Sequence, residues 1–205
     1  MTPYRLRVDD PAERVVLLDE AGRAIGTAAK DSVHGRHTPL HLAFSCYVFD
    51  SAGRLLVTRR ALDKVTWPGV WTNTACGHPA PGEALVDAVP RRVRQELGIE
   101  IDDLTVVLPD YRYRAVMANG TVENEMCPVF AAWTVDRPEL NPAEVDATAW
   151  VAWPEFSAGV LAGSRDVSPW CLDQVRQLTD LPTGPRDWPG APQSALPIAA
   201  RRVGT

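Results

Sequence analysis

The chain has 205 residues, enough for one domain with a sizeable core, and its 45% aliphatic and aromatic residues and 23% charged residues are typical of a soluble globular protein. A net charge of −5 argues against a broadly basic surface for nucleic acid, so any anionic ligand is expected to be small. Because every apolar run is shorter than the ~20 residues of a membrane span, and the polar start lacks a signal-peptide core, we expect a cytoplasmic protein without a membrane or nucleic-acid partner.

Two strand hairpins are predicted in the first sixty residues. Residues 13–30 read as two short strands around a polar turn at 19–22, and residues 41–60 repeat the pattern with a turn at 50–53. Further along the chain, strands are predicted within 104–116, 123–135 and 147–153, and helices within 154–163 and 168–180.

One amphipathic helix is predicted between these strands, within residues 84–99. Its apolar side chains recur at four-residue steps, and Gly98 follows the last of them, as is typical of a helix that ends at a glycine. Pro90 lies inside the pattern and removes one backbone donor, at a cost of ~3 kcal/mol unless tertiary contacts offset it, so we expect a bend. The apolar positions are Leu85, Val89, Val93 and Leu97.

Strands mixed with helices indicate a single α+β domain over residues 1–180. From residue 181 the chain is dense in proline, glycine and other small residues. Such a composition favours a loosely ordered tail over residues 181–205.

Histidine and glutamate side chains suggest a metal site. His34, His37 and His41 cluster just before a predicted strand, and imidazole is the commonest metal ligand, although a plain surface run fits this spacing equally well. Glu123 and Glu125 are two apart in a predicted strand, so both project from one face. Two readings of that face stay open. Either it is solvated, or its apolar neighbours bury the two carboxylates, which then need a cation beside them. Three histidines with two carboxylates would suit zinc or manganese.

Cys76 stands two residues before His78 in a stretch of small residues, prolines and glycines that cannot pack a core. Packing therefore does not explain this cysteine and histidine. The other three cysteines read as reduced, buried thiols, and without a Cys-x-x-Cys pair a zinc ribbon is excluded. They are Cys46, Cys127 and Cys171.

A loop and helix that begin at Gly77 resemble the Nudix box, which holds divalent metal against a diphosphate. Where Nudix hydrolases carry a cluster of glutamates, this sequence has Arg92 and Gln95, which leaves Glu83 and Glu96 as the acidic members. Metal-assisted hydrolysis needs several carboxylates, so diphosphate binding is better supported than hydrolysis. Lysine and arginine residues that grip phosphates flank the same segment.

Several motifs together resemble one family, type I isopentenyl-diphosphate isomerase, in the same order over about residues 15–178. They are residues 41–79 with TNTACGHP, the altered Nudix box, YRYRA at 111–115, VENEMCPVF at 122–130 and SPW at 168–170. The resemblance implies a Nudix-like α+β fold with a mixed sheet packed against helices. It also implies an isomerase of isoprenoid biosynthesis, a monomer or weak homodimer, whose small-molecule partner is a prenyl diphosphate.

The same resemblance implies the chemistry. Isopentenyl and dimethylallyl diphosphate interconvert when one carbon gains a proton and another loses one from the opposite face, through a carbocation that needs a dry site. Cys76 and Glu125 correspond to the acid and base. Tyr113 corresponds to the tyrosine that hydrogen-bonds this glutamate, and Trp170 to the tryptophan whose π face stabilises the cation.

Ligand roles follow from the resemblance in the same way. The metal ligands for Mn²⁺ or Zn²⁺ would be His34, His41, His78, Glu123 and Glu125. Glu96 would bind a Mg²⁺ ion that arrives with the diphosphate, and the phosphates would be held by Lys30, Arg60, Lys64 and Arg92. Two alternatives are a Nudix diphosphohydrolase, which would release phosphate, and a non-catalytic metal-binding module.

Overall fold

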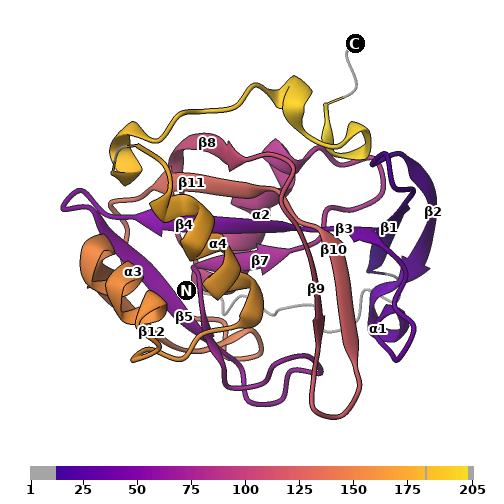
Figure 1. The fold of residues 1–205 in the computed structure, drawn as a ribbon, viewed down its shortest axis with the longest axis horizontal. Coiled ribbons are helices and arrows are strands. Elements are labelled where there is room, and N and C mark those ends of the chain that lie inside the picture. The colour runs from indigo at the N-terminus through magenta and orange to yellow at the C-terminus, as the bar shows by residue number, and fades with distance from the viewer. Residues whose placement is uncertain (1–12, 183, 203–205) are drawn as a thin grey trace, which may run out of the picture.

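Two β-sheets form the framework of the computed structural model, which describes residues 13–182 and 184–202 (Figure 1). The larger sheet has the strand order β12-β5-β4-β11-β8, with the short β6 paired to β5 and β7 paired to β4. Its strands are β4 (Phe44–Phe49), β5 (Arg54–Arg60), β6 (Trp71–Thr72), β7 (Ala75–Gly77), β8 (Asp102–Leu108), β11 (Val129–Trp133) and β12 (Val145–Ala152).

The smaller sheet has the order β2-β1-β3-β10-β9. Its strands are β1 (Arg14–Leu18), β2 (Ala24–Ala29), β3 (His41–Leu42), β9 (Arg112–Val116) and β10 (Val122–Met126). The helices are α1 (Lys30–Val33), α2 (Leu85–Leu97), α3 (Trp153–Leu161) and α4 (Pro169–Thr179), followed by the 3₁₀ helices η1 (Pro185–Asp187), η2 (Gln193–Ala195) and η3 (Ile198–Ala200).

The core lies on both faces of the larger sheet. All six residues of β4 are buried, as expected for a strand covered on both sides, and β4 pairs in parallel with β11. Phe44 and Val48 pack in the cluster that contains the apolar face of α2, whereas Tyr47 and Phe49 point the other way, into the cluster that contains residues of α3 and α4. The α+β fold with a mixed sheet against helices is therefore confirmed.

The helix predicted within residues 84–99 is α2, and Pro90 does not divide it. Proline has no N–H, so the carbonyl of Val86 lacks its usual helical partner. The helix ends where the sequence indicates: Gly98 has φ 66 and its N–H donates to the carbonyl of Arg94 at 2.9 Å. Both predicted hairpins are also present, as β1–β2 and β4–β5.

The C-terminal segment runs along the domain in its described part, residues 184–202 (Figure 1, yellow). The Ala191 N–H donates to the carbonyl of Val106 in β8 at 2.8 Å, and Trp188, Leu196 and Ala200 are buried. Proline and glycine spacing does not reveal such contacts, because each depends on a partner far away in sequence. The domain division at residue 180 stays a prediction.

Within the described residues, none of the helices combines the length and apolar character that a membrane crossing requires.

Candidate active site

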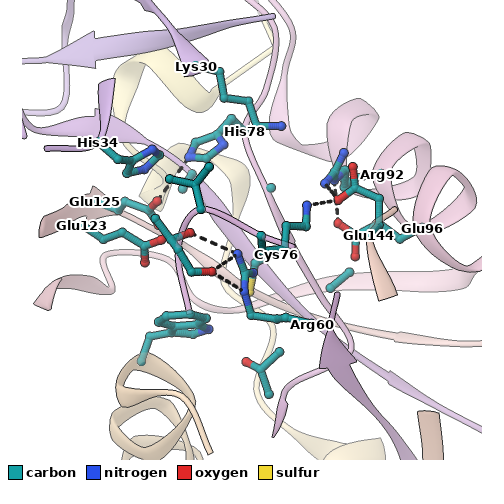
Figure 2. A pocket seen from close by; sticks show the side chains of 18 of the residues that line it. Lys30, His34, Arg60, Cys76, His78, Arg92, Glu96, Glu123, Glu125 and Glu144 are labelled. Carbon is teal, nitrogen blue, oxygen red and sulfur yellow. Dashed lines mark hydrogen bonds and ion pairs between the residues drawn. The ribbon is translucent and has the colours of Figure 1, made fainter. Parts of the chain in front are cut away.

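One pocket of about 750 Å³ collects nearly all the side chains predicted for the site (Figure 2). Its walls come from both sheets, from α1, α2 and α4, and from the loops after β5 and β7. The predicted residues that line it are Lys30, His34, Arg60, Lys64, Cys76, His78, Arg92, Glu96, Tyr113, Glu123, Glu125 and Trp170.

Strand pairing gathers four metal-ligand side chains from distant parts of the chain. β10 pairs in parallel with β3, which sets Glu125 opposite His41. A bridge between Gly35 and Val122 brings His34 to the same strand, and His78 follows directly after β7. One ligand atom from each of His34, His41, His78 and Glu125 lies within 4.8 Å of the others, so the described residues include a group that can hold a metal ion.

The hydrogen bonds of these histidines fit a bound cation. His41 Nδ1 lies 2.9 Å from the carbonyl of Pro39, which can only accept, so Nδ1 carries a proton. Its Nε2 then points at Glu125 Oε1, 3.3 Å away, and needs a proton or a metal ion between the two acceptors. His34 Nε2 is buried and has no hydrogen-bond partner among the described residues. This donor set fits a borderline divalent metal.

The two carboxylates of β10 have opposite pKa shifts. Burial would raise the pKa of Glu125, but the hydrogen bonds and charges of His41 and His78 outweigh burial and lower it well below its usual range. For Glu123, burial and then the neighbouring Glu125 charge raise the pKa to about 7. The site thus favours an ionised Glu125 beside a Glu123 that holds its proton more readily.

Tyr113 donates its hydrogen bond to Glu123, with an oxygen to oxygen distance of 2.7 Å, and not to Glu125 as the resemblance implied. Tyr113 does lie directly opposite Glu125 in the β9–β10 register, but its long side chain reaches the diagonal neighbour. Glu123 is correspondingly absent from the four-residue group of possible ligands.

Cys76 is held in β7 opposite Ser45 of β4. Its Sγ lies 3.3 Å from Ser45 Oγ and 3.3 Å from Asn73 Oδ1. Burial raises the pKa of the Cys76 thiol to about 11, so the sulfur carries its proton at neutral pH.

Trp170 forms an aromatic wall at the start of α4. It is 2% exposed, and its ring centroid lies 5.6 Å from that of Tyr113 and 5.3 Å from that of Trp67, which packs edge-on. The guanidinium carbon of Arg60 lies 5.7 Å from the Trp170 centroid, so this indole already attracts a cation.

The cationic side chains are held in place by carboxylates. Arg92 Nε lies 2.6 Å from Glu96 Oε1 one turn along α2, and Arg92 Nη2 lies 2.6 Å from Glu144 Oε2. Lys64 contacts the same oxygen of Glu144. Lys30 Nζ lies 2.6 Å from Glu13 Oε2. These ion pairs fix the charged ends of Lys30, Lys64 and Arg92, which all line the pocket.

Sequence reasoning missed several residues that the structure places at the site. Glu144 and Glu13 pair with the cations, Thr66 accepts from Arg60 through its carbonyl at 3.0 and 3.1 Å, and Asn73 and Ser45 contact the Cys76 sulfur. Only Asn73 had a local signal, since it stands within TNTACGHP.

Comparison with known proteins connects this site to a family. The NUDIX domain model matches residues 39–171. The chain is 60% identical over 188 residues to an isopentenyl-diphosphate Delta-isomerase of Saccharopolyspora erythraea, covering 92% of this chain and 97% of that one. It is 58% identical to an isopentenyl-diphosphate Delta-isomerase of Mycolicibacterium vanbaalenii, covering 87% and 98%.

Solved structures with little sequence similarity share the fold. The protein DR0079 from Deinococcus radiodurans superposes with a TM-score of 0.63 at 18% identity, covering 80% of this chain and 98% of that one. A MutT protein from Methanosarcina mazei gives a TM-score of 0.53 at 20% identity, covering 68% and 92%. At such identities the likeness concerns the fold alone.

Proposed function

The chain belongs to the NUDIX family and, within it, to the isopentenyl-diphosphate Delta-isomerases, and on this premise we propose that Cys76 and Glu125 exchange the protons that interconvert isopentenyl and dimethylallyl diphosphate. The observation that carries this proposal is that a thiol, a buried carboxylate and an indole line one pocket together with four cationic side chains. That combination suits a small molecule with an apolar end and a diphosphate end.

The chemistry requires one proton to be added and another removed. Protonation of the terminal alkene carbon gives a tertiary carbocation, and loss of a proton from the neighbouring methylene gives the allylic product. The thiol of Cys76 is protonated and Glu125 is ionised, so the pair starts with one transferable proton. Each turnover in either direction uses one member as acid and the other as base.

The carbocation needs protection from water. Glu125 is 5% exposed and Trp170 is 2% exposed, which supports a site from which water is largely excluded. The Trp170 π face stabilises the positive charge, an attraction worth about 2 kcal/mol when both groups are desolvated. Tyr113 packs against Trp170 and orders Glu123 at the same wall.

Binding of the diphosphate is assigned to Lys30, Arg60, Lys64 and Arg92. Three of these cations, Lys30, Lys64 and Arg92, already face carboxylates of Glu13, Glu96 and Glu144, so three of the four positive charges are paired within the protein. A diphosphate would therefore bring uncompensated negative charge, which supports a Mg²⁺ ion entering with it near Glu96. Arg92 stands where a Nudix hydrolase would have a carboxylate, which favours retention of the diphosphate.

A second metal ion, Mn²⁺ or Zn²⁺, would be held by His34, His41, His78 and Glu125, and we keep Glu123 as the proposed fifth ligand. When bound, this ion supplies a fixed positive charge that changes the proton affinity of the Glu125 carboxyl. The histidines orient Glu125 through its Oε1, 3.2 Å from His78 Nε2.

The proposal also covers the partners of the protein, its location and its oligomeric state. The negative net charge and the small size of the pocket support a prenyl diphosphate partner, with no nucleic-acid or membrane partner. We also propose a cytoplasmic monomer or weak homodimer.

An isotope experiment tests the reaction. The protein is incubated with isopentenyl diphosphate and Mg²⁺ in deuterated water, and the products are followed by NMR. Deuterium in dimethylallyl diphosphate is the expected result. Release of phosphate without an allylic product would instead identify a diphosphohydrolase, and no turnover of either kind would leave a metal-binding module.

The acid–base pair is tested by Cys76→Ala and Glu125→Gln. Each should lower kcat about 10³-fold or more, because each removes a group that transfers a proton. Cys46→Ala is the matched control, since Cys46 is a buried thiol of the core cluster outside the pocket lining. Activity close to that of the unmodified chain in either site variant would refute the assignment.

A further inference from the structure

We propose that Asn73 positions Cys76 and Trp170 relative to each other through its single carboxamide oxygen; this inference rests on the proposed roles of those two residues. Asn73 is fully buried and lies in the loop between β6 and β7. It is absent from the side chains that line the pocket, so it would act through its neighbours and would not touch the substrate.

The orientation of the Asn73 amide is fixed by its nitrogen. Nδ2 donates to the backbone carbonyl of Cys46 at 3.1 Å and to that of Ala75 at 3.0 Å. An amide nitrogen has two protons and both bonds require one, so the oxygen must point the other way. A flipped amide would set its oxygen against two carbonyl oxygens.

The oxygen thus oriented lies between the proposed acid–base thiol and the proposed cation-stabilising ring. Trp170 Nε1 donates to Oδ1 at 3.3 Å, and Cys76 Sγ donates to the same atom at 3.3 Å. An indole nitrogen can only donate, and a buried indole usually requires an acceptor. Both hydrogen bonds end on the same oxygen, so this atom fixes the rotation of the Trp170 ring and the direction of the Cys76 S–H bond.

The Cys76 sulfur is also held from its other side. Gln174 Nε2 donates to Ser45 Oγ at 2.9 Å, and Gln174 Oε1 accepts from Tyr47 at 3.0 Å. Ser45 therefore keeps its own proton for a sulfur, with Cys76 Sγ 3.3 Å away and Cys127 Sγ 3.5 Å away. Between the Ser45 hydroxyl and the Asn73 oxygen, the S–H bond of Cys76 is directed toward the Asn73 oxygen, which can only accept.

This arrangement has a kinetic consequence. Proton transfer to carbon depends steeply on alignment, and a misplacement of about 1 Å costs about 100-fold in rate. The diphosphate is bound elsewhere in the pocket, by cations that Asn73 does not contact. Loss of the Asn73 oxygen should therefore lower kcat and leave KM nearly unchanged.

The first test is Asn73→Ala. We expect kcat to fall about 100-fold with KM for isopentenyl diphosphate changed less than threefold. In ¹H–¹⁵N spectra the Trp170 indole resonance, assigned with Trp170→Phe, should move while the other indole resonances stay. Unchanged kcat, or an unmoved Trp170 resonance in the folded variant, would overturn the proposal.

Thr74→Val is the matched control in the same loop. Thr74 is also fully buried, and its hydroxyl donates to the carbonyl of Leu56 at 2.6 Å and accepts from the Val48 N–H at 2.8 Å. This variant should lose stability yet keep kcat and the Trp170 resonance. If it lowered kcat as Asn73→Ala does, general loosening of the loop would explain both and the proposal would fail.

A measurement on the wild-type chain covers the case in which Asn73→Ala does not fold. In the wild-type chain, the Trp170 indole proton should have the small temperature coefficient of a hydrogen-bonded proton. A coefficient like that of a solvated indole would contradict the Asn73 contact.

These outcomes are separable from the proposed function. If Cys76→Ala abolishes isomerisation while Asn73→Ala behaves like the wild type, only the positioning role fails. If the wild-type chain forms no dimethylallyl diphosphate, the proposed function itself fails.

Discussion

Glu125 is the residue on which the site depends most. Its strand, β10, lies between β3 and β9 in the smaller sheet. His41 of β3 and Tyr113 of β9 are therefore its direct neighbours across the sheet. Two adjacent buried carboxylates cannot both ionise cheaply, and here the histidines decide which one does. Glu125 is ionised by its contacts with His41 and His78, while Glu123 is left with a raised pKa and the hydrogen bond from Tyr113.

Metal binding should weaken in acid, and the pKa values of the histidines set the pH range in which the affinity falls. Burial opposes protonation of His41, but the hydrogen bond and charge of Glu125 outweigh it and raise its pKa above the usual value. A metal ion must then displace a proton from His41 at any pH below that raised pKa. Affinity for Mn²⁺ should fall about tenfold for each pH unit below it. Burial lowers the pKa of His34 to about 4, so His34 adds no competition until the solution is far more acidic.

Calorimetric titration of the chain with Mn²⁺ at pH 8, 7 and 6 measures this effect. His37→Gln is the control, because His37 is exposed and lies outside the four-residue group. It should have the same affinities as the unmodified chain. An affinity independent of pH over this range would contradict the arrangement.

At the scale of elements, the contact of β7 with α2 brings the Cys76 sulfur and Arg92, one of the proposed phosphate-binding cations, into the same pocket. Gly77 stands between Cys76 and His78, and a Cβ added there would lie 2.9 Å from Arg92 Cγ and 3.1 Å from Phe44 Cζ. Glycine is therefore needed for close approach of the strand to the helix. The same helix presents Arg92 and Glu96 one turn apart on the face toward the pocket.

Gly77→Ala should displace the Arg92 side chain from the pocket. Weakening one charge-assisted hydrogen bond costs about 1.5 kcal/mol, so KM for isopentenyl diphosphate should rise roughly tenfold. Gly26→Ala is the control, because a Cβ at Gly26 meets no atom within 4 Å. Steady-state kinetics distinguish the two variants, and an unchanged KM in Gly77→Ala would show that Arg92 does not contact the substrate.

At the scale of the whole molecule, the C-terminal segment ties the two halves of the core together. Leu196 and Ala200 belong to the cluster that contains the apolar face of α2. Trp188 belongs to the other cluster, with its ring centroid 5.1 Å from that of Trp153 and 5.8 Å from that of Phe49. Both faces of the larger sheet are therefore partly covered by residues beyond position 184.

Trp188→Ala should lower the free energy of unfolding by about 3–5 kcal/mol, because it empties a buried aromatic site. Trp188→Phe should cost much less, since it keeps most ring contacts and removes an indole N–H that has no partner among the described residues. Urea unfolding monitored by circular dichroism measures both. If the alanine variant were as stable as the unmodified chain, the segment would not contribute to the core.

Local patterns by themselves predicted the longer helices and strands and the chemical groups of the site, but not the short α1, β6 and β7. Alternation in β10 puts both glutamates on one face, and the step of four residues in α2 puts Arg92 and Glu96 on another. No local packing pattern explains why Cys76 and His78 stand where they do. These signals are carried by residues near one another in sequence.

Only the tertiary structure decided which groups contact each other. Tyr113 contacts Glu123 because the two are diagonal neighbours across β9 and β10. Glu144, from another loop, forms ion pairs with both Lys64 and Arg92. Asn73 accepts a hydrogen bond from Trp170, which is ninety-seven residues away in sequence. The packing of the C-terminal segment against β8 has the same origin. Each contact depends on strand pairings between distant segments, and the periodicity of a single segment contains no information about its partner.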